Sequence, residues 1–168
     1  MINNEFPDMQ IVMPLVTGTK ITEDVPGNIK LLYGRTTEAL ACSEAAAVAS
    51  GTATLETALL GIPMVVYYKV SPLTFFLGKF LVNLRFFALV NLLSGRKVVE
   101  ELLQKEATAE NIFSELKRLL TDQSCRSEMI AALQKIQEMM EGKRTSERVA
   151  RITGEIAGWD TTDNAVTL

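Results

Sequence analysis

Short apolar runs separated by polar turns fill the first hundred residues of the chain. Four of these runs, at residues 10–13, 28–33, 45–49 and 64–67, are too short to be typical helices and are rich in apolar side chains. The segment 37–43 between the second and third runs has a helical composition. Short apolar strands between helices predict an α/β fold, in which a parallel sheet is covered by helices on both faces.

The stretch from Ala49 to Tyr67 carries the most informative local pattern. It predicts a strand, a Ser50-Gly51-Thr52 turn, a short helix ending near Gly61 and a second strand, which together form a βαβ unit of Rossmann-like type. The first N–H groups of a helix have no intrahelical partners and attract anions. Glu56 follows Thr52 by one helical turn.

Two interpretations of this turn are open from spacing alone. The turn is either an ordinary helix cap followed by an acid, or a nucleotide site with the diphosphate at the turn and the ribose on Glu56. Ligands of open parallel sheets bind at the carboxyl ends of the strands, and Ser50–Thr52 follows such an end. The position therefore favours binding.

A second polar block follows at residues 91–104. Asn91 and the pair Gly95-Arg96 are expected in a polar loop after an apolar run, and Glu101 and Gln104 are expected to open a helix.

From Thr108 onward the periodicity predicts helices. The expected core stripes are Ile112, Leu116, Leu119 and Leu120, then Met129, Leu133, Ile136 and Met140. A last helix, capped by Ser146, is expected to turn Val149, Ile152 and Ile156 inward. Residues 158–168 are predicted to form a polar tail.

Composition excludes several chemistries. The 168 residues suit one domain, and the formal net charge of −3 argues against nucleic acid as the main partner. The absence of histidine excludes Ser-His-Asp and Cys-His catalytic systems and His-containing zinc sites. Cys42 and Cys125 stand alone, so neither a disulfide framework nor a metal site is expected.

The stretch from Ser71 to Val90 holds five of the seven phenylalanines, with Lys79 and Arg85 among them. Charges and Gly78 interrupt it too often for a membrane-spanning helix. Two roles are open: a helix in the membrane interface, or a helix buried against another domain. The candidate membrane contacts are Phe75, Phe76, Lys79, Phe80 and Arg85.

Several motifs in order resemble one known family. They are SGTATLE at 50–56, GIPMVV at 61–66, YKVS at 68–71 and, above all, NLLSGRKVVEELLQ at 91–104. The chain thereby resembles lipid-A-disaccharide synthases, from about Phe6 to the last helix. The resemblance implies a two-domain glycosyltransferase fold of the B type. Residues 6–157 would be part of its C-terminal, UDP-sugar-binding domain, followed by the polar tail, with the N-terminal acceptor domain absent.

By this resemblance the enzyme transfers 2,3-diacylglucosamine from its UDP-linked donor to 2,3-diacylglucosamine 1-phosphate (lipid X). The products are the β-1,6-linked lipid A disaccharide and UDP. No metal or other cofactor is implied, and the location would be the cytoplasmic face of the inner membrane. Ser50, Gly51 and Thr52 would meet the diphosphate and Glu56 the ribose. The residues expected to complete the donor side are Asn91, Gly95, Arg96, Glu101 and Gln104.

The chain also departs from that family. The acceptor domain and the family's Pro-Gly-Ser-Arg turn are missing, and the acids expected to act as general base belong to the missing part. We therefore expect no transferase activity from this chain alone, with an N-terminal half encoded upstream. The alternative is a non-catalytic nucleotide-sugar-binding remnant or a membrane-associated module of the same fold. A different nucleotide-sugar enzyme, such as an epimerase, fits the block at 91–104 less well.

Overall fold

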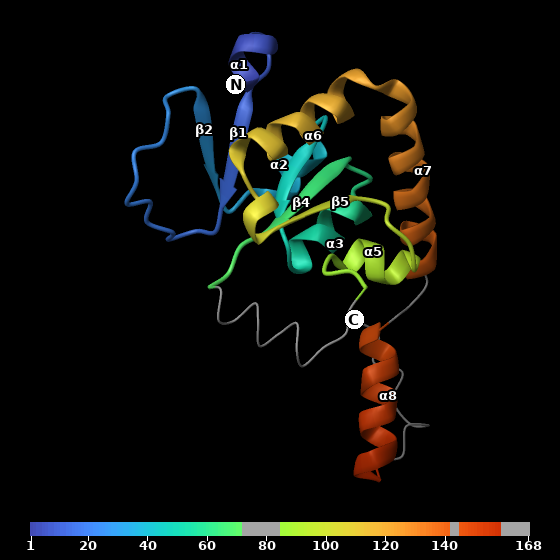
Figure 1. The fold of residues 1–168 in the computed structure, drawn as a ribbon. Coiled ribbons are helices and arrows are strands. Elements are labelled where there is room, and N and C mark those ends of the chain that lie inside the picture. Colours follow the sequence, from blue (N-terminus) through green and yellow to red (C-terminus); the bar gives the residue numbers. More distant parts are fainter. Residues whose placement is uncertain (72–84, 142–144, 159–168) are drawn as a thin grey trace. The chain divides into compact units, whose positions relative to one another are not determined.

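The computed structural model describes residues 1–71, 85–141 and 145–158, and these form two compact units (Figure 1). The first unit is Met1–Glu138 and the second is Met139–Leu168. Four of the candidate membrane contacts, Phe75, Phe76, Lys79 and Phe80, lie outside the described residues. Within the described ranges, no helix is both long and apolar enough to span a bilayer.

Helices and strands alternate through the first unit, as the hydrophobic pattern predicts. The strands are β1 (Ile11–Leu15), β2 (Ile29–Tyr33), β3 (Ala46–Ala49), β4 (Met64–Tyr68) and β5 (Glu100–Leu103). The helices are α1 (Ile2–Glu5), α2 (Thr36–Ala41), α3 (Thr52–Leu59), α5 (Leu89–Ser94), the 3-10 helix η1 (Gln104–Glu106), α6 (Ala109–Thr121) and α7 (Gln123–Met140).

Every strand pair among the described residues is parallel, which confirms the α/β, Rossmann-like class. They form a two-stranded sheet, β1-β2, and a three-stranded sheet in the order β3-β4-β5. In the second sheet Ala49 is opposite Tyr67, and Tyr68 is opposite Leu103, so the three strands end at one edge. The unit β3-α3-β4 is the predicted βαβ unit.

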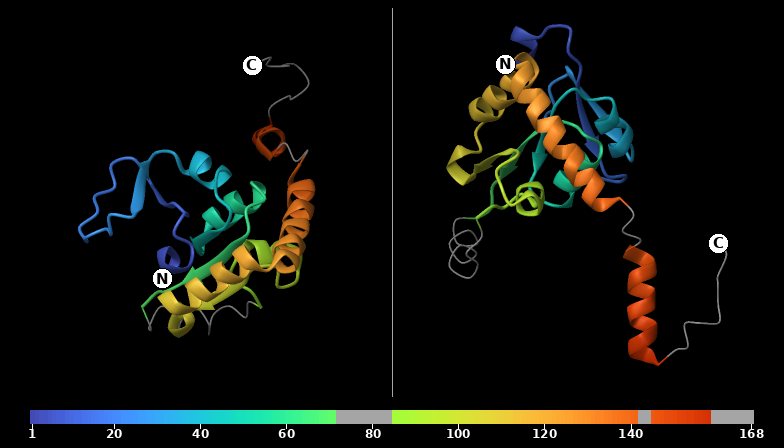
Figure 2. Two further views of the ribbon diagram at one scale, coloured as in Figure 1. Left: turned by 90° about the horizontal axis from the view of Figure 1, so that it is seen from above. Right: turned by 90° about the vertical axis from the view of Figure 1, so that its right-hand side faces the viewer.

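Helices cover both faces of the three-stranded sheet. On one face Val65 and Leu102 pack with Leu116 of α6 in a buried apolar cluster. Side chains alternate along a strand, so Glu101 points to the opposite face, where it contacts the start of α5. The view from above in Figure 2 shows β4 running between α3 and α6. The central strand β4 is therefore covered on both faces, whereas Ala47 and Ala49 of the edge strand β3 are exposed.

In the block 91–104 the predicted loop at Gly95-Arg96 is confirmed, but the elements predicted for Asn91, Glu101 and Gln104 were wrong. Asn91 lies inside helix α5 and is fully buried, not in a loop. Glu101 lies in β5, and Gln104 opens only the three-residue η1. Two consecutive acids resemble a helix start, but the β-branched pair Val98-Val99 before them favours extended backbone. Helix α2 begins at Thr36, after Arg35 as an N-cap residue without a side-chain bond.

The second unit contains the helix α8 (Thr145–Ala157), so the last predicted helix is confirmed. The predicted burial of its apolar stripe is wrong: Val149, Ile152 and Ile156 are 56%, 41% and 82% exposed. The described residues of this unit hold no sheet and no second complete helix that could cover the stripe.

Candidate functional site

The turn after β3 depends on a glycine. Gly51 has φ 156° and ψ −162°, a conformation that side-chain-bearing residues rarely adopt. A Cβ atom there would meet nothing within 4 Å, so the space beside the backbone is open. The Gly51 carbonyl accepts hydrogen bonds from the hydroxyl and the N–H of Thr54, at 2.7 and 3.2 Å. The backbone conformation at position 51 thus favours glycine, whereas the space around it would admit a larger side chain.

Helix α3 begins without a side-chain cap. Its N-cap residue is Gly51, which has no side chain to accept a bond from the first turn. The Thr54 hydroxyl, which could have served as an acceptor, donates to the Gly51 carbonyl instead. Thr52 and Glu56 are both exposed on this helix. No side-chain cap is therefore formed at this turn, and the N–H groups of α3 that precede Thr54 have no intrahelical partner.

Ser50 ties this turn to two other segments. Its N–H donates to the carbonyl of Tyr67 at 2.9 Å, which continues the pairing of β3 with β4. Its hydroxyl donates to the carbonyl of Phe87 at 3.4 Å, across 37 residues of sequence. The Phe87 ring stacks on Tyr68, with ring centroids 6.2 Å apart.

Gln104 lies at the same edge of the sheet, directly after β5. Its φ of +50° is the only positive value among the described non-glycine residues. The Gln104 Oε1 accepts a bond from the Val70 N–H at 3.3 Å, while its Nε2 is buried without an acceptor. Strained backbone and an unpaired buried donor are features that often mark functional sites. We call Ser50, Gly51, Thr52 and Gln104 the carboxyl edge.

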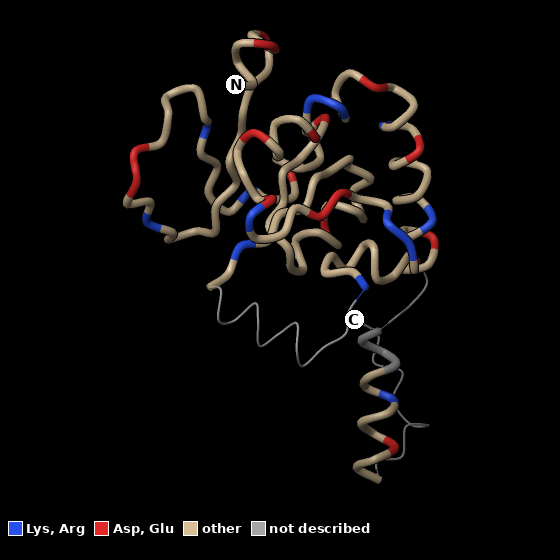
Figure 3. Tube along the Cα trace, viewed as in Figure 1, with Lys and Arg blue, Asp and Glu red and all other residues tan. Residues whose placement is uncertain are grey.

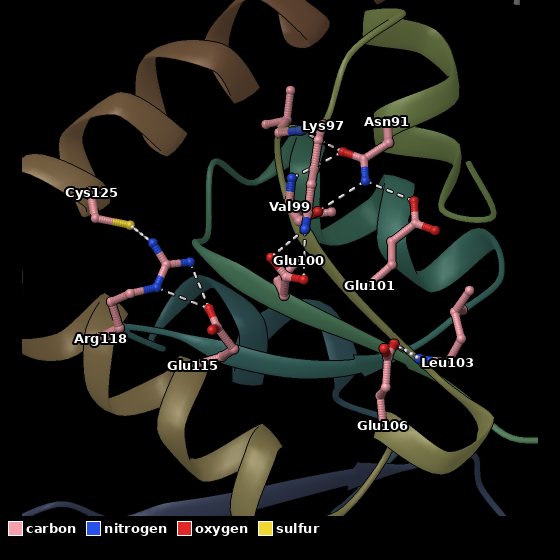
Figure 4. Close-up of polar contacts among 11 residues, drawn as sticks. Asn91, Lys97, Val99, Glu100, Glu101, Leu103, Glu106, Glu115, Arg118 and Cys125 are labelled. Carbon is pink, nitrogen blue, oxygen red and sulfur yellow. Dashed lines mark hydrogen bonds and ion pairs between the residues drawn. The ribbon is translucent and has the colours of Figure 1, made fainter. Parts of the chain in front are cut away.

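Asn91, which is fully buried, and Glu101, which is half-buried, bond to each other (Figure 4). The Asn91 Nδ2 donates to Glu101 Oε1 at 2.7 Å and to the Val99 carbonyl at 2.9 Å. Its Oδ1 accepts from the N–H groups of Val98 and Val99, at 2.7 and 2.9 Å. The amide of Asn91 can make four hydrogen bonds, and all four are formed within the protein.

The other contacts of Glu101 reach the residues before α5. Its Oε2 accepts from the Phe87 N–H at 2.9 Å, and its Oε1 accepts from the Ala88 N–H at 3.1 Å. Three donors, including that of Asn91, thus share one carboxylate. The predicted donor contacts Asn91 and Glu101 are occupied by partners inside the chain.

Gly95 and Arg96 lie at the opposite edge, which we call the amino edge. Gly95 ends α5 with φ 63°, and the chain then enters β5 at Glu100. Arg96 lines a cavity of about 170 Å³ together with Met129 of α7. The Met129 sulfur accepts from the N–H of Met64, the first residue of β4. Because β4 and β5 are parallel, this cavity lies where the strands begin.

Two of the cations at the amino edge are paired with glutamates. Lys97 binds Glu100 at 2.6 Å, and Arg118 binds Glu115 at 2.6 Å. The hydrogen bond to Glu115 raises the pKa of the Arg118 guanidinium, which also contacts the Cys125 sulfur at 2.6 Å. Figure 3 shows positive and negative segments interspersed along the first unit.

A second cavity, of about 250 Å³, was not predicted from the sequence. Its lining residues, on β5, η1 and α6, are Glu100, Leu102, Glu106, Asn111, Ser114 and Glu115. Two of its acids are paired with Lys97 and Arg118, and the described residues contain no cluster able to hold a metal ion.

The structure thus divides the nine predicted donor contacts. Ser50, Gly51, Thr52 and Gln104 lie at the carboxyl edge, with Glu56 one turn into α3. Asn91 and Glu101 are internal, and Gly95 and Arg96 lie at the amino edge. Sequence reasoning missed the part played by Phe87 and Ala88, because they act through backbone groups that any residue would carry.

Comparison with known proteins gives one family. The model of a family described as lipid-A-disaccharide synthetase matches residues 1–153. A lipid-A-disaccharide synthase from Solibacter usitatus is 42% identical over 139 residues, covering 80% of this chain and 36% of its own length. Those from Coxiella burnetii (strain Dugway 5J108-111) and Geobacter metallireducens are 37% and 35% identical, covering 90% and 94% of this chain.

The chain spans about two fifths of the length of these relatives, 41% and 43% in the latter two. The match of the family model runs through both sheets and into α8. Motif order, parallel α/β architecture and sequence identity agree, and the chain belongs to the lipid-A-disaccharide synthetase family.

Proposed function

We propose that this chain is the donor-nucleotide-binding part of a lipid A glycosyltransferase. The observation that carries the proposal is the uncapped, exposed start of α3 at the carboxyl edge of a parallel sheet. Free N–H donors, the helix dipole and an open backbone at Gly51 suit an anion there. A disaccharide synthase needs an activated sugar donor, and we assign the diphosphate of a nucleotide sugar to this turn.

We assign the remaining contacts to the UDP-sugar from the positions of the side chains near this turn. The hydroxyls of Ser50 and Thr52 lie beside the helix start and can turn toward phosphate oxygens. Glu56 is exposed one turn along α3, where its carboxylate can accept bonds from ribose hydroxyls. The Gln104 Nε2 supplies a donor without a present acceptor. Because no metal is assigned, these N–H and hydroxyl donors would stabilise the departing UDP.

The full reaction would join two lipid-linked sugars. We assign UDP-2,3-diacylglucosamine as donor and lipid X as acceptor, giving the β-1,6 disaccharide and UDP. The acceptor side and the general base would come from the part of the relatives that this chain does not span. The 168-residue chain is therefore expected to bind UDP and not to turn over. Product formed by the purified chain from both lipid substrates would contradict this, and a chain without UDP affinity would be a remnant of the fold alone.

A titration of UDP into the purified chain tests the donor assignment. Glu56→Ala should weaken UDP binding about tenfold, as expected for losing hydrogen bonds to a charged acceptor. Glu138→Ala, another exposed helical glutamate, is the matched control and should leave the affinity unchanged. UMP should bind more weakly than UDP, because it lacks the second phosphate. Equal affinity of wild type and Glu56→Ala would remove the ribose assignment.

We also propose that the protein works at the cytoplasmic face of the inner membrane, because both assigned substrates carry acyl chains. Among the described residues of the Phe-rich stretch, Arg85 is exposed, with its guanidinium 5.4 Å from the centroid of the Phe86 ring. A cation beside an aromatic ring suits a membrane interface. Liposome co-sedimentation of wild type and a Phe75→Asp, Phe76→Asp variant tests this, and equal binding would contradict it.

A further inference from the structure

Asn91 and Glu101 form a hydrogen-bonded pair that spans β5 and α5. We propose that this pair is a positioning device that sets the Ser50 hydroxyl, and that neither residue contacts the donor. The proposal rests on the proposed function, because it concerns how the diphosphate turn is held. It gives these two residues a role different from the direct contact that the family resemblance implies.

The first step is the saturation of the Asn91 amide. Asn91 is fully buried, and its amide makes four internal bonds. A ligand could bond to it only by displacing a partner that would then be buried and unpaired, which costs about 1–3 kcal/mol. Asn91 therefore serves to orient the Glu101 carboxylate, to which its Nδ2 donates at 2.7 Å.

The second step leads from Glu101 to the backbone before α5. The carboxylate accepts the N–H groups of Phe87 and Ala88, at 2.9 and 3.1 Å. Bonds to a charged acceptor are about twice as strong as neutral ones, so this short segment is fixed on β5. The stacking of Phe87 on Tyr68 of β4 holds the same segment from another side.

The third step leads from Phe87 to the diphosphate turn. The peptide group before Ala88 carries the Phe87 carbonyl, and this carbonyl accepts the Ser50 hydroxyl at 3.4 Å. That length is near the limit of a hydrogen bond, so the bond is weak and can be exchanged for one to a phosphate oxygen. The carbonyl thus keeps the hydroxyl close to the turn without competing strongly with the ligand. Glu101 acts on the donor only through this carbonyl.

A double-mutant cycle on UDP affinity tests the coupling. Ser50→Ala and Glu101→Gln are each expected to weaken UDP binding about tenfold. If Glu101 acts through Ser50, the double variant should bind no more weakly than the weaker single variant. Glu106→Gln is the matched control, because Glu106 also accepts a backbone N–H near β5, at 3.5 Å, but is exposed. It should leave UDP affinity unchanged. Additive losses in the double variant would overturn the positioning role.

Amide exchange of the unliganded chain keeps the test independent of UDP. Glu101→Gln should speed the exchange of the Phe87 and Ala88 amides at least tenfold and shift the NMR signals of Ser50 and Gly51. Glu106→Gln should do neither. Unchanged Ser50 and Gly51 signals in Glu101→Gln would overturn the inference even if the chain binds UDP. Shifted signals in a chain that does not bind UDP would uphold the coupling and reject the donor assignment instead.

Discussion

The two edges of the three-stranded sheet differ in how their polar groups are used. At the carboxyl edge, α3 starts without a cap and the buried Gln104 amide nitrogen has no acceptor. At the amino edge, Lys97 and Arg118 are each paired with a glutamate. Residues from one 14-residue block, 91–104, contribute to both edges. Closeness in sequence therefore does not bring residues to one edge, and the unsatisfied polar groups are why we propose the carboxyl edge as the ligand site.

Breaking the link behind the carboxyl edge should have the largest effect. Asn91→Ala leaves two N–H groups, one carbonyl and part of the Glu101 carboxylate without partners in the interior. We expect the free energy of unfolding to fall by about 3–5 kcal/mol, measured by urea denaturation. Asn111→Ala, which removes one exposed side-chain bond, should cost less than about 1 kcal/mol. Similar losses in both variants would contradict the structural role of Asn91.

The second-largest effect is expected from a change in the backbone of the carboxyl edge, at Gly51. Gly51→Ala forces a side chain into a conformation reserved for glycine, although its Cβ would meet nothing within 4 Å. The expected cost is about 1–3 kcal/mol of unfolding free energy, from backbone strain alone. Gly27→Ala has equally open surroundings and no left-handed φ, so its stability should stay the same or rise. Thermal unfolding of the two variants makes the comparison, and equal melting temperatures would show that the Gly51 turn is not strained.

The smallest expected effect tests the comparison of the edges most directly. Arg96→Ala should change UDP affinity less than twofold, because Arg96 lines the amino-edge cavity beside α7. Ser50→Ala, at the other edge, should weaken binding about tenfold. The two titrations are done side by side. A loss in Arg96→Ala as large as that in Ser50→Ala would restore the contact that the family resemblance implies for Arg96.

The sequence predicted the architecture from particular patterns. The run at 64–67 became the buried strand β4, and the Ser-Gly-Thr turn opened α3 as expected. Glycine and proline allowed the ends of β4 and α3 to be predicted, because the backbone conformations of these two residue types depend little on distant contacts. The stripe containing Leu133 and Ile136 was also confirmed, since both side chains are buried. Short sequence patterns therefore predicted the elements whose structure depends on neighbouring residues.

The candidate site could be predicted only in part. Ser50, Gly51 and Thr52 were predicted because their residue types suit an anion site, and the structure brings them together at the start of α3. The internal bonds of the Asn91–Glu101 pair were not predicted, because a buried asparagine and a ligand-binding asparagine look alike in one sequence. Asn91 also bonds to backbone groups of Val98 and Val99, and such groups cannot be recognised from residue types. The turn of β5 at Gln104, with φ +50°, was equally hidden, since it is set by tertiary contacts.

The Asn91–Glu101 pair also bears on the order in which the chain folds. Its bonds join residues 7 to 14 positions apart, from Asn91–Val98 to Phe87–Glu101. Closing so short a loop loses little chain entropy, so α5 and β5 can associate early. The bond from Ser50 to Phe87 spans 37 positions and closes a longer loop. We therefore expect α5 and β5 to form a folding nucleus on which the β3–α3 turn assembles later.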